Sequence, residues 1–371
     1  MGFKPLLLLF IASLVACSHS GPRYPVEADF GNHALKTTVD SEIAKYYAEE
    51  YLQERRANAE WNILLDSLHA TSGVPDGAKL NDLSNRFGVD FTALFLAKQL
   101  ISDPENKRIA ERFTRNFERE KQAQSGVLPG DYLVAFAPGW FYRRNPQTGA
   151  DFAAPRRILE RRGVKTRLIE TEEAGTVERN AEIISAALTR MSSEHKKIIL
   201  VSTSKAGPEA ALALSMLIES PHKVKAWVNI GGLLRGTKLA DEALQWPQRL
   251  YVRFFILGGY SFDGINSLTR ERSKERLKKQ APLDDILVVN YAAIPMSGQV
   301  SEDAGYGYGV LSEEGPNDGL TLITDELVLG GLTLIELGLD HYYRHPQIHH
   351  KTAALAQTVI EYLMERESKK D

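Results

Sequence analysis

The sequence contains a single cysteine, Cys17, among 371 residues. One cysteine excludes an internal disulfide and any metal site built from several thiolates. The formal net charge is only −3 at pH 7, so no excess of positive charge favours a nucleic acid as partner. The chain also lacks an apolar run long enough to cross a bilayer, which takes about 20 residues. Its hydrophobic content of 43 % suffices for one large core or two smaller ones.

The first residues have the features of a secretory signal. Lys4 supplies a positive charge, and an apolar run of 11 residues, Leu6 to Ala16, leads to Cys17. This run is too short for a spanning helix and is typical of a cleaved signal peptide. An ordinary signal peptide with an incidental cysteine is one interpretation of this segment.

The tetrapeptide Leu14-Val15-Ala16-Cys17 resembles the lipobox of bacterial lipoproteins. In that family the signal, here residues 1–16, is removed and the cysteine carries lipid such as palmitate. Each buried methylene of an acyl chain contributes about 0.8 kcal/mol, so several chains hold a soluble domain at a membrane surface. The resemblance implies lipidation of Cys17 and a bacterial cell-envelope location. Because Ser18 and not Asp follows the cysteine, it favours the outer membrane.

The pattern of apolar residues along the remaining chain changes near residue 126. Residues 17–35 are rich in Gly, Pro, Ser and His and are expected to form a tether. Apolar residues at helical spacing predict a helical N-terminal region over 36–125, which carries no motif for chemistry. Strands then alternate with helices over 126–371. This pattern predicts an α/β fold, a mostly parallel sheet with helices on both faces, with a lid or insertion at about 233–285.

One strand of this domain, "KIILVST", runs directly into Ser204, Lys205 and an Ala-rich helix. Functional loops gather at the carboxyl ends of such strands. A nucleophile on a tight strand-to-helix turn needs small residues two positions before and after it, and Ser202 and Ala206 meet this need around Ser204. The following helix directs its N-terminus at the site and favours developing negative charge. A Ser/Thr helix cap after a strand is the alternative interpretation.

A second motif overlaps the first. Ser202 to Lys205 also forms S-x-x-K, the motif of penicillin-binding serine enzymes. That motif requires the serine at the start of a helix and the lysine one turn later. Ser202 still belongs to the predicted strand, and no "SDN" or "KTG" follows downstream, so Ser204 is the better candidate.

Two later residues complete a catalytic order of serine, acid and histidine. Asp318 lies in an Asn-Asp-Gly turn, and His341 directly follows the predicted strand "LTLIELGL". Each alone is an ordinary turn or loop residue. Together they predict a base that reaches Ser204 across the sheet edge and an acid that holds the imidazole in the right tautomer.

These residues resemble the α/β-hydrolases, and more closely the secreted bacterial triacylglycerol lipases. "NIGGLLRGTKLAD", residues 229–241, is similar to the family segment "IGTPHRGSxxAD", and "GPNDGL" is similar to "NDGLV". The likeness covers about residues 130–367. By position it implies that Ser204 is the nucleophile, Asp318 the acid and His341 the base.

The sequence departs from the lipase pattern at three places. The elbow is "STSKAG" where the family has "GHSxGG", and Leu233-Leu234 replaces Pro-His. The loop after the first strand has Pro138, Gly139 and Trp140 where the family has "HG". Because an oxyanion hole needs backbone N–H groups, those of Lys205 and Trp140 are expected to form it. The departures bear on the substrate class more than on the triad.

Two further features of the sequence bear on binding. The apolar segment 250–262 lies between two strands and can either bind a fatty chain or pack internally. Three histidines near the end have no carboxylate at a ligand spacing, so no metal and no cofactor is expected there. They are His345, His349 and His350.

The sequence therefore predicts a membrane-anchored serine hydrolase that cleaves carboxylic esters, lipid esters among them, through an acyl-enzyme on Ser204. Its expected partners are a small-molecule or lipid ester and a membrane reached through lipidated Cys17, with no nucleic acid. A non-catalytic binding lipoprotein of the cell envelope that keeps the hydrolase fold is the alternative. A structural envelope lipoprotein that acts through its helical region is a third interpretation.

Overall fold

The computed structural model describes residues 23–31, 33–71, 73–122, 126–128, 131–246 and 261–369. The chain forms two compact units, each assembled from segments that are far apart in the sequence. The first unit contains the chain up to Gln99 with Ala293–Thr324 and Leu337–His341. The second contains Leu100–Ala292, Asp325–Glu336 and the chain from Tyr342 onward. The expected boundary at residue 126 thus lies inside the second unit.

The second unit is built on a six-stranded sheet with the strand order β4-β3-β5-β6-β7-β8. The pairs of neighbours from β4 to β7 are parallel. The strands are β3 (Tyr132–Ala137), β4 (Lys165–Leu168), β5 (Lys197–Thr203), β6 (Val224–Ile230), β7 (Leu287–Ile294) and β8 (Leu332–Leu337). All six residues of β3 are buried, which is why the central strands read as uninterrupted apolar runs.

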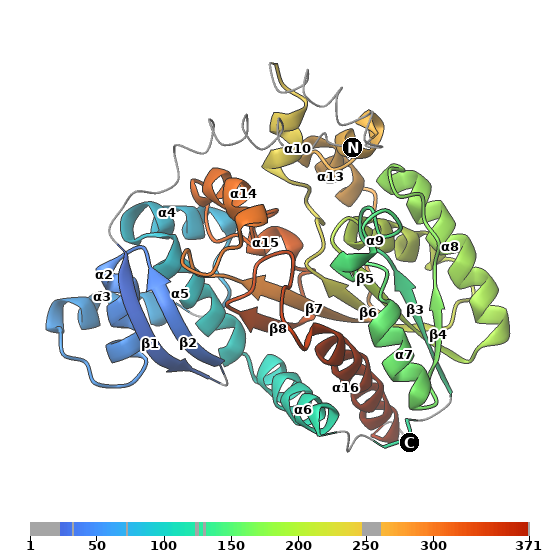
Figure 1. Cartoon of the computed structure of the whole chain (residues 1–371), viewed down its shortest axis with the longest axis horizontal. Helices are drawn as coiled ribbons and strands as arrows, with labels where there is room; N and C mark the ends of the chain where they lie inside the picture. Colours follow the sequence, from blue (N-terminus) through green and yellow to red (C-terminus); the bar gives the residue numbers. More distant parts are fainter. Residues whose placement is uncertain are drawn as a thin grey trace, which may run out of the picture. The chain divides into compact units, whose positions relative to one another are not determined.

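Helices cover both faces of this sheet (Figure 1). The long ones are α6 (Pro104–Lys121), α7 (Ala153–Arg161), α8 (Val177–Glu194), α9 (Ala206–Leu217) and α16 (Ile348–Ser368). Helices α8 and α9 share a core with Leu133 and Ala135 of β3. Since neighbouring strand residues face opposite sides, Phe136 points the other way, where its ring packs on Phe152 before α7. The predicted α/β architecture is therefore confirmed.

None of the described helices is both long and apolar enough to cross a membrane. The remaining helices of the second unit are short. The short ones are η3 (Pro146–Thr148), α10 (Lys238–Ala243), α12 (Phe262–Asn266) and α13 (Arg270–Leu277). Helix α15 (Ile323–Glu326) begins in the first unit and ends in the second.

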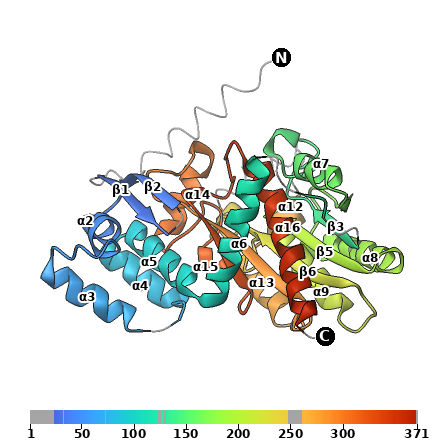
Figure 2. The same cartoon turned by 90° about the horizontal axis from the view of Figure 1, so that it is seen from below.

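Helix α6 lies beside α16 (Figure 2). Arg108 and Arg112 of α6 both pair with Glu365 of α16, and Lys369 and Arg112 lower the pKa of that carboxylate to about 2. Asn116 donates to the hydroxyl of Thr358 at 3.1 Å. The last helix of the expected N-terminal region is thereby part of the second unit.

The first unit begins with an antiparallel hairpin of β1 (Tyr24–Phe30) and β2 (His33–Val39). The tether expected over 17–35 is therefore wrong for residues 24–35, while residues 17–22 lie outside the described chain. Val26, Phe30 and Leu35 are buried. Val26 and Phe30 lie four residues apart and therefore share one face of β1, with only the small Ala28 between them on that face. This weak alternation, together with Pro25, gives a faint strand signal in the sequence.

Helices follow the hairpin, as the apolar spacing predicted. They are α2 (Glu42–Tyr46), a π-helix (Tyr47–Tyr51), α3 (Ala59–His69), α4 (Gly77–Phe87), α5 (Val89–Ser102) and, later in the chain, α14 (Glu302–Ser312). Their aromatic stripes are packing faces: Tyr47 stacks on Tyr51 and meets the edge of Phe91. Asn58 and Asp76 cap α3 and α4, because their side chains accept hydrogen bonds from backbone N–H groups in the first turn.

A buried carboxylate, Asp90, lies in the first turn of α5 with 0 % of its surface exposed. It accepts hydrogen bonds from Asp40 N at 2.7 Å, Ser297 N at 2.7 Å, Ser297 Oγ at 2.6 Å and the Tyr308 hydroxyl at 3.3 Å. Asp40 in turn accepts from the backbone N–H groups of Val89 and Asp90. Burial, and to a lesser degree the neighbouring Asp40, raises the pKa of Asp90 to about 7.

The raised pKa makes folding stability depend on pH. Protonated Asp90 favours the folded state, and that contribution is lost as pH rises from about 4 through 7. Asp90→Asn removes the titration. We therefore expect the unfolding free energy of the wild type, minus that of the variant, to fall by about 1.4 kcal/mol per pH unit between pH 5 and 7. Urea unfolding of both proteins at several pH values measures it, and a difference independent of pH would contradict the assignment.

Candidate active site

Ser204 occupies a strained turn between β5 and α9. Its φ angle is +55°, in the left-handed region that non-glycine residues seldom adopt. Backbone bonds hold it there: Ser204 N donates to Ile230 O at 3.0 Å, and Leu233 N donates to Ser204 O at 3.2 Å. A strained serine between a strand and a helix is the geometry of a nucleophile elbow. A plain helix cap has a φ angle in the extended region instead.

The small residues of "STSKAG" are needed for close packing under the turn. A Cβ added at Gly207 would lie 2.5 Å from Gly232 Cα and 3.0 Å from Asn229 Oδ1. Both neighbours belong to the segment around the end of β6. The first turn of α9 thus lies directly against that segment, and only glycine fits.

Ser202 is not a second nucleophile. It is the sixth residue of β5, is completely buried, and its Oγ accepts a hydrogen bond from Trp227 Nε1 at 2.8 Å. Lys205, the lysine of the rival S-x-x-K motif, pairs with Glu209 instead. The structure therefore excludes the penicillin-binding arrangement, as the strand position of Ser202 indicated.

The side chain of Lys205 forms a buried ion pair below the elbow. Its ammonium group contacts Glu209 one turn later in α9, and Asn180 Nδ2 of α8 donates to the same carboxylate at 2.8 Å. Burial raises the pKa of Glu209, whereas Lys205 acts to lower it. Our reading of the sequence missed this pair, although an i, i+4 lysine and glutamate at the start of a helix is a visible signal.

The loop expected to supply the oxyanion hole lies beside the elbow. A Cβ at Gly139 would come 3.2 Å from Thr203 Cγ2, so the loop backbone closely approaches the residue before Ser204. The Lys205 ammonium lies 5.8 Å from the centre of the Trp140 ring. Trp140, Lys205 and Ser204 are therefore brought together within the second unit.

Asp318 and His341 form a hydrogen-bonded pair within the first unit. Asp318 Oδ2 lies 2.5 Å from His341 Nδ1, and His341 N donates to Asp318 O at 2.8 Å. The other carboxylate oxygen, Oδ1, accepts from the N–H groups of Leu320 and Thr321, each at 2.8 Å. Because a carboxylate faces Nδ1, the proton of a neutral ring is expected on that nitrogen, and Nε2 is then the acceptor atom of the ring.

The remaining sequence candidates fall in different places. Cys17 and residues 250–260 of the apolar segment lie outside the described residues. Of the late histidines, His350 contacts Glu120 at 3.1 Å and His345 accepts from Gln347 N. Within the described chain no three His, Cys, Asp or Glu side chains gather in a way that could hold a metal ion.

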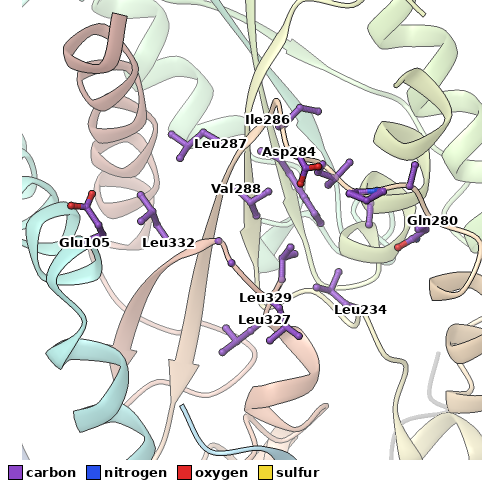
Figure 3. Close-up of a pocket in the computed structure, with 18 of the residues that line it drawn as sticks. Glu105, Leu234, Gln280, Asp284, Ile286, Leu287, Val288, Leu327, Leu329 and Leu332 are labelled. Carbon is purple, nitrogen blue, oxygen red and sulfur yellow. The ribbon is translucent and has the colours of Figure 1, made fainter. Parts of the chain in front are cut away.

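An open groove of about 870 Å³ lies on the second unit (Figure 3). Ile286, Leu287 and Leu332 at the amino ends of β7 and β8 line one part of it. Pro208 of α9 and Leu234, next to the residue that bonds Ser204, line another. The lining also carries charged side chains, among them Glu105, Arg108 and Asp284, and it includes neither Ser204 nor Lys205.

Solved structures share this fold. A metagenomic carboxyl esterase superposes with a TM-score of 0.53 at 21 % identity, covering 65 % of this chain and 78 % of its own. The mature form of a Bacillus licheniformis lipase superposes with a TM-score of 0.50 at 19 % identity, covering 64 % and 94 %. No protein-family model and no curated protein matches the sequence. The likeness establishes the α/β-hydrolase fold predicted from the sequence.

Proposed function

We propose that the protein is a serine hydrolase that cleaves carboxylic esters through Ser204, His341 and Asp318. The observation that carries the proposal is the left-handed φ of +55° at Ser204, on a strand-to-helix turn in an α/β-hydrolase fold. The buried Asp318–His341 pair supports it, because such a pair fixes the tautomer that a general base requires. The esterase and lipase named among the fold relatives agree with this reaction class.

In the proposed mechanism Ser204 Oγ attacks the ester carbonyl carbon while His341 Nε2 accepts the hydroxyl proton. The N–H groups of Lys205 and Trp140 stabilise the oxyanion of the tetrahedral intermediate. The C–O bond then breaks, and His341 returns its proton to the leaving alcohol. Water attacks the acyl-enzyme in the same way and releases the carboxylic acid and free Ser204.

Covalent labelling by a fluorophosphonate probe tests the nucleophile. We expect the wild type to be labelled on Ser204 and Ser204→Ala to lose labelling and at least about 10⁴-fold in ester hydrolysis. Ser202→Ala is the matched control: it removes only the bond from Trp227, costs about 1 kcal/mol of stability, and keeps the label.

Folded wild type that takes no label would contradict the proposal. The favoured function would then be the alternative, a non-catalytic cell-envelope protein that uses the hydrolase fold for binding. A label on a serine other than Ser204, identified by peptide mass spectrometry, would keep the enzyme class and reject the site.

We also propose that lipid on Cys17 anchors the protein to a membrane of the cell envelope. The support is the lipobox-like sequence from Leu14 to Cys17 and the short apolar run before it. In a bacterial host, metabolic labelling with palmitate is expected to mark the wild type and leave Cys17→Ala unmarked. The variant is expected to appear in the soluble fraction, and equal labelling of both proteins would reject the anchor.

A further inference from the structure

The acid and base of the candidate triad belong to the same compact unit as the N-terminal helices. Asp318 and His341 are drawn from Ala293–Thr324 and Leu337–His341, and the rest of this unit is the chain up to Gln99. No catalytic motif lies before residue 99, so the question is what that region contributes. The hydrogen bonds of the buried Asp90 give an answer.

The first connection runs through the segment that follows β7. Both Oγ and N of Ser297 donate to Asp90, which fixes the backbone and the side chain of that residue. Four residues later, Ser301 N donates to Asp340 Oδ2 at 2.7 Å. Asp340 is buried and directly precedes His341. The segment 297–301 is thereby held by Asp90 at one end and by the neighbour of the base at the other.

The second connection runs through α14. The Tyr308 hydroxyl donates to Asp90 at 3.3 Å, and the Tyr308 carbonyl accepts from Asn317 Nδ2 at 3.4 Å. Asn317 is buried and directly precedes Asp318. The same carboxylate is therefore linked to the neighbour of the acid and to the neighbour of the base.

The number of donors makes Asp90 hard to replace. Its two oxygens accept from two backbone N–H groups and two hydroxyl groups, all in a site with 0 % exposure. The ionised carboxylate accepts at both oxygens, whereas an asparagine offers one oxygen and two N–H donors. Asn at this position therefore leaves one buried backbone N–H without its acceptor, and the segment must shift to satisfy it.

We propose that Asp90 is a positioning residue, which fixes the two segments that carry Asp318 and His341 through Ser297 and Tyr308. The N-terminal helical region is then part of the scaffold of the acid–base pair. The inference rests on the proposed function only for the statement that this pair is catalytic. The positioning itself concerns contacts inside one unit.

The test compares wild type with Asp90→Asn and Ser297→Ala by two readouts at pH 8, where the Asp90 carboxylate is mostly ionised. The first is the proton NMR signal of His341 Nδ1–H, which a strong hydrogen bond to a carboxylate moves downfield, assigned by its loss in His341→Ala. The second is the rate of fluorophosphonate labelling. A displacement of about 1 Å costs on the order of 10²-fold in rate. We expect Asp90→Asn to shift or broaden the signal and to slow labelling about 10- to 100-fold, with a smaller effect in Ser297→Ala.

Asp66→Asn is the matched control, because it makes the same chemical change in the same unit. Asp66 contacts Tyr51 and Arg56 and has no hydrogen bond to the segments that hold the pair. It is expected to leave the signal and the labelling rate unchanged. Circular dichroism confirms that each variant is folded at the assay temperature.

An unshifted signal with an unchanged labelling rate in folded Asp90→Asn would overturn the inference. If Asp90→Asn does not fold, Ser297→Ala decides by the same two readouts. Wild type that shows the proton signal but takes no label would reject the proposed function alone, and the signal in the variants would still decide whether Asp90 positions the pair.

Discussion

Replacing Asp318 by Asn is expected to lower kcat about 10⁴-fold without unfolding the protein. Asparagine keeps an oxygen at the Oδ1 position, so the turn bonds from Leu320 and Thr321 remain. Its amide nitrogen then faces His341 Nδ1 and donates to it. The imidazole must place its proton on Nε2, the atom that accepts the proton of Ser204 in the proposed mechanism. The loss is thus one of tautomer and not of geometry.

The measurement is kcat for a soluble ester together with the rate of fluorophosphonate labelling, and both should fall in parallel. Asp303→Asn is a suitable control. Asp303 is exposed in the first turn of α14, so this variant carries the same chemical change outside the Asp318–His341 pair. A kcat for Asp318→Asn within about tenfold of the wild type would mean that another group orients His341, because one mispositioned proton costs far more than that.

Replacing Lys205 by Met is expected to destabilise the fold by about 3–5 kcal/mol. Lys205 and Glu209 are both almost completely buried. Methionine preserves most of the lysine volume but leaves Glu209 with only the hydrogen bond from Asn180. An unpaired charge in the interior is the costly product of such a change, and the raised pKa of Glu209 allows it to take up a proton in response.

Chemical unfolding of single and double variants distinguishes the effect of an unpaired buried charge from the effect of altered packing. Lys205→Met with Glu209→Leu replaces both charges by apolar groups, and we expect it to recover most of the lost unfolding free energy. Equal destabilisation of the single and double variants would show that packing, and not the unpaired charge, is responsible. Labelling of Ser204 in the double variant then reports whether the ion pair also supports the elbow.

The sheet and the strand-to-helix turn at Ser204 could be predicted because their signals are local. Buried parallel strands read as apolar runs, and a serine between such a strand and an Ala-rich helix is visible in a window of ten residues. The order of Ser204, Asp318 and His341 can likewise be read directly from the sequence. The hydrogen bond between Asp318 and His341 followed from that order and from the strand end before the histidine.

The contribution of the N-terminal region could not be predicted in this way. Asp90 and Ser297 are 207 positions apart, and neither lies in a motif. The hairpin at 24–39 was missed because its buried positions, such as Val26 and Phe30, are separated by polar residues and follow a stretch rich in Gly and Pro. The hydrogen bonds of Asp90 and the hairpin both depend on contacts between distant residues and on burial. Neither the contacts nor the burial can be read from a single sequence.

The discontinuity of the first unit has a consequence for how the chain is made. Its opening segment ends at Gln99, but the next segment that completes it begins only at Ala293. At 5–20 residues per second, ribosomes need roughly 10–40 s to synthesise the intervening stretch. During that time Asp90 lacks the hydrogen bonds from Ser297 and Tyr308. The contacts that complete the first unit therefore form only after residues 100–292 have been made, and their high sequence separation favours slow closure of the unit.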